Sequence, residues 1–221
     1  MKQFMPALMD RPVLLVISDG TGEYARLLRI ASELAPVIDG FILREKHWTA
    51  RQMWEWGEEL LRSGFPRHKL IINDRLDVSL ALAAGGVQIT SHSVPLAALK
   101  PHLSQEMAAG VSVHSLSEGL EAATSGAQWV LFGHIFQTPS KPGLPGHGTA
   151  VLKNMVDQLP VPVIAVGGIT PDNAAQVLAT GCAGIAVISA VMSASKPLQE
   201  AMALKEQIAR FADKPAHNDD S

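Results

Sequence analysis

Eight short apolar runs alternate with segments of helical periodicity along most of this 221-residue chain. The runs are rich in valine and isoleucine and carry little charge, which is typical of strands buried on both faces of a parallel sheet. They are Val13–Ser18, Val37–Leu43, Lys69–Asn73, Gly86–Ile89, Gly110–Val113, Trp129–Phe132, Val163–Val166 and Gly184–Ile188. Such an alternation predicts a parallel sheet with a helix after each strand.

The segments between the runs carry apolar residues at helical spacing. They are Glu23–Leu34, Ala50–Leu61, Leu76–Ala83, Ser117–Ser125, Thr149–Leu159, Thr170–Thr180 and Leu198–Ala212. Ser117 and Thr170 are the expected N-caps of their helices. Two prolines interrupt residues 94–103, so we expect a short or irregular helix there.

The number of repeats and the chain length favour an α/β fold of one domain, a closed (β/α)8 TIM barrel. An open doubly wound sheet is the alternative. We expect an N-terminal arm at residues 1–12, the barrel at 13–212 and a flexible C-terminal tail at 213–221.

Composition limits the partners of the chain. The net charge is -3, which gives no reason to expect nucleic acid or an anionic membrane surface. Cys182 is the single cysteine, so a reducing, cytoplasmic location is expected. No apolar run has the roughly 18 residues of a membrane span. The apolar helices would allow a homodimer.

Polar residues follow almost every apolar run. In a barrel, the carboxyl ends of all strands meet at one face, and that face carries the chemistry. Arg44, Lys46, Asn73 and Ser112 are therefore candidate substrate-binding residues. His134 comes directly after a buried strand, and an imidazole titrates near neutral pH, so it is the candidate catalytic acid and base. The alternative is a rim histidine hydrogen-bonded to a neighbouring carbonyl.

The last two strands end in a pattern that predicts a phosphate site. Gly167 and Gly168 lack side chains, so their backbone N–H groups can approach an anion, and Ile188 and Ser189 offer a hydroxyl and the amides of a helix start. Barrel enzymes often bind phosphate in these two loops. The alternative is that the glycines only form a tight turn.

Several segments taken together resemble the thiamine phosphate synthase superfamily. They are Leu43–Lys46, Ile71–Asp77, Gly86–Val87, Val111–Ser115, Val130–Gly133, Pro162–Gly168 and Gly184–Ala190. Each motif alone is weak, but they occur in the expected order from Leu15 to Val191.

The superfamily has two branches, and three positions separate them here. Synthases join a pyrimidine diphosphate to a thiazole phosphate with magnesium. They carry a pyrimidine-binding glutamine where this chain has Ile42, a magnesium-binding aspartate where it has Ser93, and a proline where it has His134. The thiazole tautomerases, typified by TenI, aromatise a thiazole carboxylate phosphate without a metal and carry their acid/base histidine at the position of His134. The resemblance is therefore closer to the tautomerase branch.

This resemblance implies thiamine biosynthesis, with metal-independent tautomerisation of a phosphorylated thiazole by His134. It implies no cofactor and no metal site, with Mg²⁺ needed only if the chain is a synthase. Arg44 and Lys46 would hold the ring carboxylate, or else form an internal ion pair with Asp74 and Asp77. We expect only one of Ser112 and His114 to face the barrel interior.

Three other functions remain open. The first is the synthase reaction, in which Lys141 matches the lysine that holds diphosphate. The second is an aldolase that would use Lys46 as a Schiff-base nucleophile. The third is a non-catalytic regulator that binds a phosphorylated ligand.

Overall fold

The computed structural model describes residues 11–138 and 143–212. Eight parallel strands form a closed barrel in which each strand pairs with the next along the chain and β8 pairs with β1. The strands are β1 (Val13–Ile17), β2 (Gly40–Leu43), β3 (Leu70–Asn73), β4 (Gly86–Ile89), β5 (Ala108–Val113), β6 (Trp129–Gly133), β7 (Val163–Val166) and β8 (Gly184–Val187). The predicted single-domain (β/α)8 barrel is confirmed.

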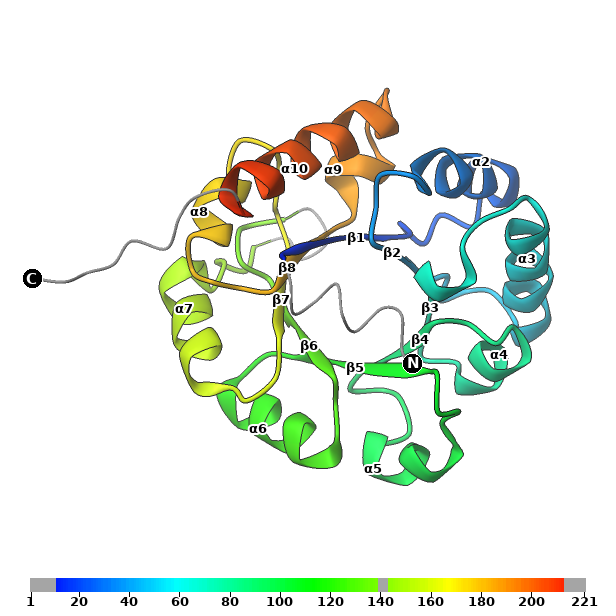
Figure 1. The fold of residues 1–221 in the computed structure, drawn as a ribbon, viewed down its shortest axis with the longest axis horizontal. Coiled ribbons are helices and arrows are strands. Elements are labelled where there is room, and N and C mark those ends of the chain that lie inside the picture. The colour runs from blue at the N-terminus through cyan, green and yellow to red at the C-terminus, as the bar shows by residue number, and fades with distance from the viewer. Residues whose placement is uncertain (1–10, 139–142, 213–221) are drawn as a thin grey trace, which may run out of the picture.

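Helices surround this barrel (Figure 1). They are α2 (Tyr24–Leu34), α3 (Ala50–Arg62), α4 (Leu76–Ala81), α5 (Leu96–Leu99), α6 (Leu116–Ser125), α7 (Gly148–Gln158), α8 (Ala174–Leu178), α9 (Ser189–Met192) and α10 (Pro197–Ala212), with short 3-10 turns at Arg67–Lys69 and Lys100–His102. No helix in the described ranges is long and apolar enough to cross a membrane.

Local chemistry sets several helix ends. Thr49 and Gln52 form a reciprocal capping box at the start of α3. The N-cap of α6 is Ser115, whose hydroxyl accepts the Glu118 N–H at 3.2 Å, so the prediction of Ser117 was wrong. The prediction of Thr170 for α8 was also wrong: residues 170–173 form a turn, and the helix begins after Asn173.

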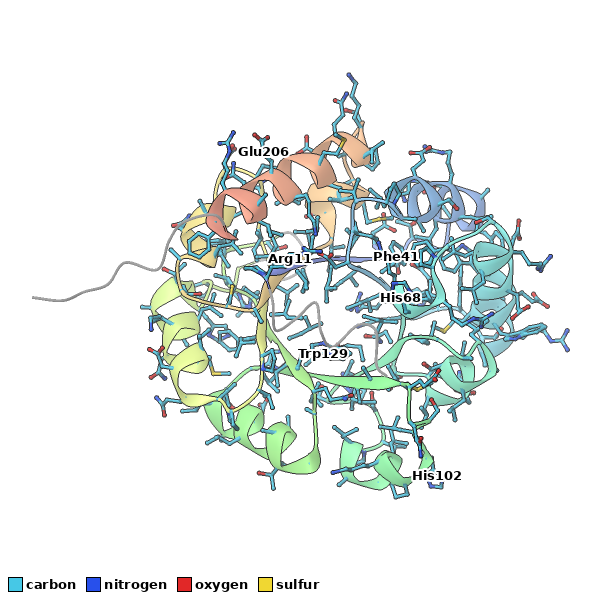
Figure 2. All side chains as sticks on the ribbon, in the orientation of Figure 1. Arg11, Phe41, His68, His102, Trp129 and Glu206 are labelled. Atoms are coloured by element: carbon cyan, nitrogen blue, oxygen red, sulfur yellow. The ribbon has the colours of Figure 1, made fainter. Side chains whose placement is uncertain are left out.

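Side chains fill the inside of the barrel in one apolar cluster. Its largest member is Trp129, which is fully buried within the ring of strands (Figure 2). Gly110 makes room for this indole, because a Cβ atom at Gly110 would lie 2.1 Å from the ring. The indole Nε1 donates to the Gln88 side-chain oxygen at 3.0 Å, and the Gln88 amide nitrogen donates to the Ser112 hydroxyl at 3.1 Å. This packed floor closes the barrel below the site.

The predicted terminal segments can be placed only in part. Arg11 and Pro12 are described, whereas the rest of the predicted N-terminal arm and the tail at 213–221 lie outside the described residues. Arg11 contacts the end of the barrel opposite the site, where its guanidinium donates to Asp39 at 2.7 Å.

Candidate functional site at the carboxyl ends of the strands

A cavity of about 650 Å³ opens at the carboxyl ends of the strands. Nine of the predicted site residues line it: Arg44, Lys46, Asn73, Ser112, His134, Gly167, Gly168, Ile188 and Ser189. The tenth, Lys141, lies outside the described residues. The prediction that polar residues at the carboxyl ends of the strands gather at one face therefore holds for residues of six strand ends. Their position does not assign a role to any of them.

The end of β2 directs two cations to the cavity. The Arg44 backbone N–H donates to the buried Ser18 hydroxyl at 2.7 Å, which ties β2 to β1. Between the two cations, the carboxylate of Glu45 is buried and accepts the N–H groups of Gly20 at 3.2 Å and Gly22 at 2.9 Å. Burial lowers the pKa of Arg44, and nearby Glu45 partly opposes this shift.

The predicted alternative of an internal ion pair at this position was wrong. Asp77 pairs with Arg75, whose Nε donates to it at 2.9 Å. Within residues 11–138 and 143–212, neither Arg44 nor Lys46 forms a salt bridge. Two positive charges thus border the cavity without a direct ion pair to any described residue, although the Glu45 carboxylate lies nearby, and such an arrangement suits an anionic ligand.

The side chains at the ends of β3 and β4 do not form a two-carboxylate metal site. Asp74 is exposed and has a left-handed φ of 67°. Ser93 occupies the position where the synthases carry a second aspartate, and its hydroxyl accepts the Thr90 N–H at 2.9 Å. Among the described residues, no group of three or more histidine, cysteine, aspartate or glutamate side chains could hold a metal ion. Magnesium prefers carboxylate oxygens, so this donor set fits it poorly.

His134 presents a buried imidazole to the cavity. The residue is only 7% exposed, and neither ring nitrogen has a hydrogen-bond partner among the described residues. The alternative of a rim histidine bonded to a neighbouring carbonyl was therefore wrong. The ring of His147 lies 5.4 Å away between centroids, and the His147 N–H donates to the His134 carbonyl at 3.0 Å. Buried polar atoms without partners are costly, so this ring is suited to bind a ligand.

The two glycines after β7 serve the packing of the neighbouring loop. Gly167 and Gly168 have φ values of 109° and 67°. A Cβ atom at Gly167 would lie 2.6 Å from the His134 Cα, and one at Gly168 would lie 2.7 Å from the Gln137 carbonyl oxygen. The Asn173 amide also donates to the Gly168 carbonyl at 2.9 Å. The tight turn is thus real, and it also lines the cavity.

A short helix follows β8, at the place where the sequence predicted a helix start, although its length was not predicted. This helix, α9, spans four residues from Ser189, too few for any periodicity to be recognised. Arg26 of α2 joins it to the loop after β1, because its guanidinium donates to Asp19 at 2.9 Å and to the Met192 carbonyl. The position of Ser189 therefore depends on a contact between residues far apart in the sequence.

Ser112 and His114 both line the cavity, but only the Ser112 side chain is seen to contact the barrel floor, where its hydroxyl accepts from Gln88 at 3.1 Å. Residues two positions apart on a strand point to the same face. The His114 backbone N–H donates to the Glu118 carboxylate at 2.8 Å, and the exposed imidazole has its Nδ1 3.5 Å from the same carboxylate. Trp48 and Thr138 also line the cavity and were missed. Trp48 follows Arg44 and Lys46 closely in the sequence, a position that could have singled it out.

Comparison with known proteins gives a consistent result over most of the chain. The thiamine-phosphate synthase of Chlorobium phaeovibrioides is 38% identical over 201 residues, covering 90% of this chain and 95% of the relative. That of Roseiflexus castenholzii is 36% identical over 200 residues, covering 87% and 86%. The structure of a thiamine phosphate pyrophosphorylase from Pyrococcus furiosus has a TM-score of 0.79 and 33% identity, covering 92% of this chain and 98% of that one.

These relatives overturn the prediction of a thiazole tautomerase. That prediction depended on three positions, Ile42, Ser93 and His134, whereas the similarity to proteins named as synthases extends over almost the whole barrel. A few changed side chains alter a site without changing the ancestry of the chain. The family described as thiamine monophosphate synthase (TMP-TENI) matches residues 13–191. The chain belongs to this family.

Proposed function

We propose that this chain is a thiamine-phosphate synthase, a transferase of thiamine biosynthesis that joins a hydroxymethylpyrimidine diphosphate to a thiazole phosphate. The observation that supports it most is the pair Arg44 and Lys46, which border a cavity of about 650 Å³ and form no ion pair within the described ranges. Two cations without counter-ions suit a diphosphate, and relatives at 36–38% identity carry the synthase name.

In this reaction the bond between the pyrimidine methylene carbon and the diphosphate oxygen breaks, and the thiazole nitrogen forms a new bond to that carbon. Pyrophosphate leaves with the bonding electrons. Arg44 and Lys46 neutralise the charge that develops on its oxygen, which lowers the barrier more than binding alone would. Lys141, outside the described residues, is proposed to assist on the same group.

The second substrate is proposed to lie at the ends of β7 and β8, and β1 separates β8 from β2 in the closed barrel. The backbone at Gly167, Gly168 and Ile188, together with the Ser189 hydroxyl, is proposed to bind the thiazole phosphate. His134 would donate or accept a hydrogen bond to the heterocycle, and Asn73 and Ser112 would complete the polar lining. These contacts orient the two rings for attack.

The synthases of the superfamily that this chain resembles use magnesium. In this chain Ser93 cannot supply a second carboxylate beside Asp74, and the described residues contain no group of three or more ligands for an ion, so they do not fit a protein-held ion. The proposed mechanism therefore assigns no step to a metal bound by side chains.

The test is to incubate the purified protein with both substrates and measure thiamine phosphate. Arg44→Ala should lower kcat/KM by about 100-fold or more, because removing one charged partner of a developing anion costs about 3 kcal/mol. Arg51→Ala is the matched control, since Arg51 is exposed on α3 and does not line the cavity. Absence of product with the unaltered chain would refute the proposal. Substrate binding without turnover would instead favour the non-catalytic regulator.

A further inference from the structure

One side of the cavity is apolar and bordered by an indole. Ile17 and Ile42, 5% and 1% exposed, line it from the apolar cluster inside the barrel, whereas Met53, 3% exposed, and half-buried Trp48 line it from the apolar cluster that packs against the helices. Ile17 and Ile42 are directly paired across β1 and β2. No polar side chain comes from these four positions, so any ring that enters here meets hydrocarbon and an aromatic face.

Trp48 is held firmly in place. Its ring centroid lies 5.7 Å from that of Tyr24 at 31°, and 6.3 Å from that of Trp56 at 56°. Its backbone N–H donates to the Glu45 carbonyl at 3.1 Å, and the Glu45 carboxylate in turn fixes the loop at Gly20 and Gly22. A side chain fixed in this way loses little entropy when a flat ligand contacts it.

The same segment carries the anion-binding side chains. Arg44 and Lys46 precede Trp48 by four and two residues, and all three line the cavity. Because all three border one cavity, a ligand whose diphosphate is bound by these cations could reach the indole with its attached ring. Gln88, a side-chain amide deeper in the cavity, already uses its oxygen for Trp129 and its nitrogen for Ser112.

We propose that Trp48 is a specificity-determining residue that contacts the face of the pyrimidine ring, with Ile42 packing against its edge; this inference rests on the proposed function. Because residue 42 has no hydrogen-bonding group, the site reads the ring by shape and apolar contact. It therefore discriminates weakly between the 4-aminopyrimidine diphosphate and its 4-deamino analogue. A site that hydrogen-bonds the amine would reject the analogue about 10⁴-fold, whereas an apolar pocket separates such pairs by about 100-fold or less.

The experiment measures binding by titration calorimetry without the thiazole phosphate, so it does not depend on turnover. The ligands are the hydroxymethylpyrimidine diphosphate, its 4-deamino analogue and inorganic pyrophosphate. For the unaltered chain, the Kd values of the two pyrimidines should agree within about 10-fold. Ile42→Gln should increase the preference for the amino compound by about 10-fold, because it restores a hydrogen-bonding amide.

Trp48→Ala should weaken both pyrimidines by about 10-fold, as loss of one stacked aromatic contact does, while Trp48→Phe should keep most of the affinity. Neither variant should change pyrophosphate affinity, which separates a ring contact from a general structural defect. Trp54→Ala is the control, because Trp54 is exposed on the following helix α3 and does not line the cavity. The inference would be overturned if the unaltered chain preferred the amino compound over its 4-deamino analogue by more than about 1,000-fold. It would also be overturned if the Trp48→Ala variant bound the pyrimidines as tightly as the unaltered chain does. Tight binding without product would refute only the synthase function.

Discussion

Asp39, at the end of the barrel opposite the site, offers a direct test of what stabilises the closed fold. Its side chain is 9% exposed and accepts hydrogen bonds from Arg11 at 2.7 Å, from Lys205 at 2.5 Å and from the Leu14 N–H at 2.8 Å. These contacts join the start of β1, the residue before β2 and helix α10. Asp39→Asn removes the charge while nearly preserving the shape.

The expected cost can be worked out from these contacts. Breaking a buried ion pair from one side costs about 3–5 kcal/mol. Arg11 is 42% exposed and Lys205 is 27% exposed, so solvent screening reduces this figure. Burial also lowers the pKa of Lys205, even though its bond to Asp39 opposes the shift, so desolvation offsets part of the attraction. We therefore expect a loss of about 2 kcal/mol in the free energy of unfolding, and a Tm lower by about 4–8 °C.

The same carboxylate predicts a pH dependence. Burial by itself would raise the pKa of Asp39, but the hydrogen bonds from Arg11, Lys205 and the Leu14 N–H outweigh it, and the net pKa lies below the ordinary value. The stabilisation is therefore complete above the unfolded pKa of about 3.9 and is lost as the pH falls through the folded pKa. Urea unfolding of both proteins should give a difference that is constant from pH 7 to about pH 5 and shrinks below about pH 4.

Asp157→Asn is the matched control, because Asp157 forms an exposed pair with Lys153 on the surface of α7. It should cost less than about 0.5 kcal/mol. Equal losses for the two variants, or a difference for Asp39→Asn that grows as the pH falls, would refute this reasoning.

Three further predictions concern the barrel floor and the site. Gly110→Ala should lower stability by about 3 kcal/mol or more, measured by urea unfolding, because its Cβ would overlap the Trp129 ring; an unchanged midpoint would contradict the packing. His134→Leu should keep or raise stability by about 1 kcal/mol, since it removes two unpartnered buried nitrogens, while kcat/KM falls by about 10-fold. Ser93→Asp should tighten Mg²⁺ binding by about 10-fold in titration calorimetry by adding a carboxylate to the rim that carries Asp74; unchanged affinity would show that the two positions are too far apart.

The sequence predicted the barrel well because its signals are local. Each strand is a short run of apolar residues, and each run lies within a few residues of the observed strand. The largest error at a strand start is in β2, predicted from Val37 but observed from Gly40. There the N–H groups of Val37 and Ile38 still donate to the Leu34 carbonyl. Because these groups are used at the end of the helix, the strand begins a few residues later. The apolar character of these residues does not show whether their N–H groups bond to the preceding helix or to a neighbouring strand.

The features that the sequence did not reveal depend on contacts between distant segments. Helix α9 is positioned by Arg26, more than 160 residues earlier, and its four residues have no pattern of their own. Trp48 was not among the predicted site residues, because an isolated tryptophan usually packs. Its position four residues after Arg44 was a local signal, but the side chains that complete the cavity come from distant strands.

The branch of the family was the least predictable property. Ile42, Ser93 and His134 all depart from the synthase pattern, and reading each departure as a lost function led to the tautomerase. The structure suggests a different interpretation of the same three residues. Ile42 extends an apolar wall that includes Ile17, Ser93 closes a turn with Thr90, and His134 brings an unpartnered imidazole to the opposite side of the cavity. A site changed in this way keeps its two cations. Under the proposed function, the three positions would affect which ring is recognised, while the charge at Arg44 and Lys46 would decide whether a diphosphate is bound at all.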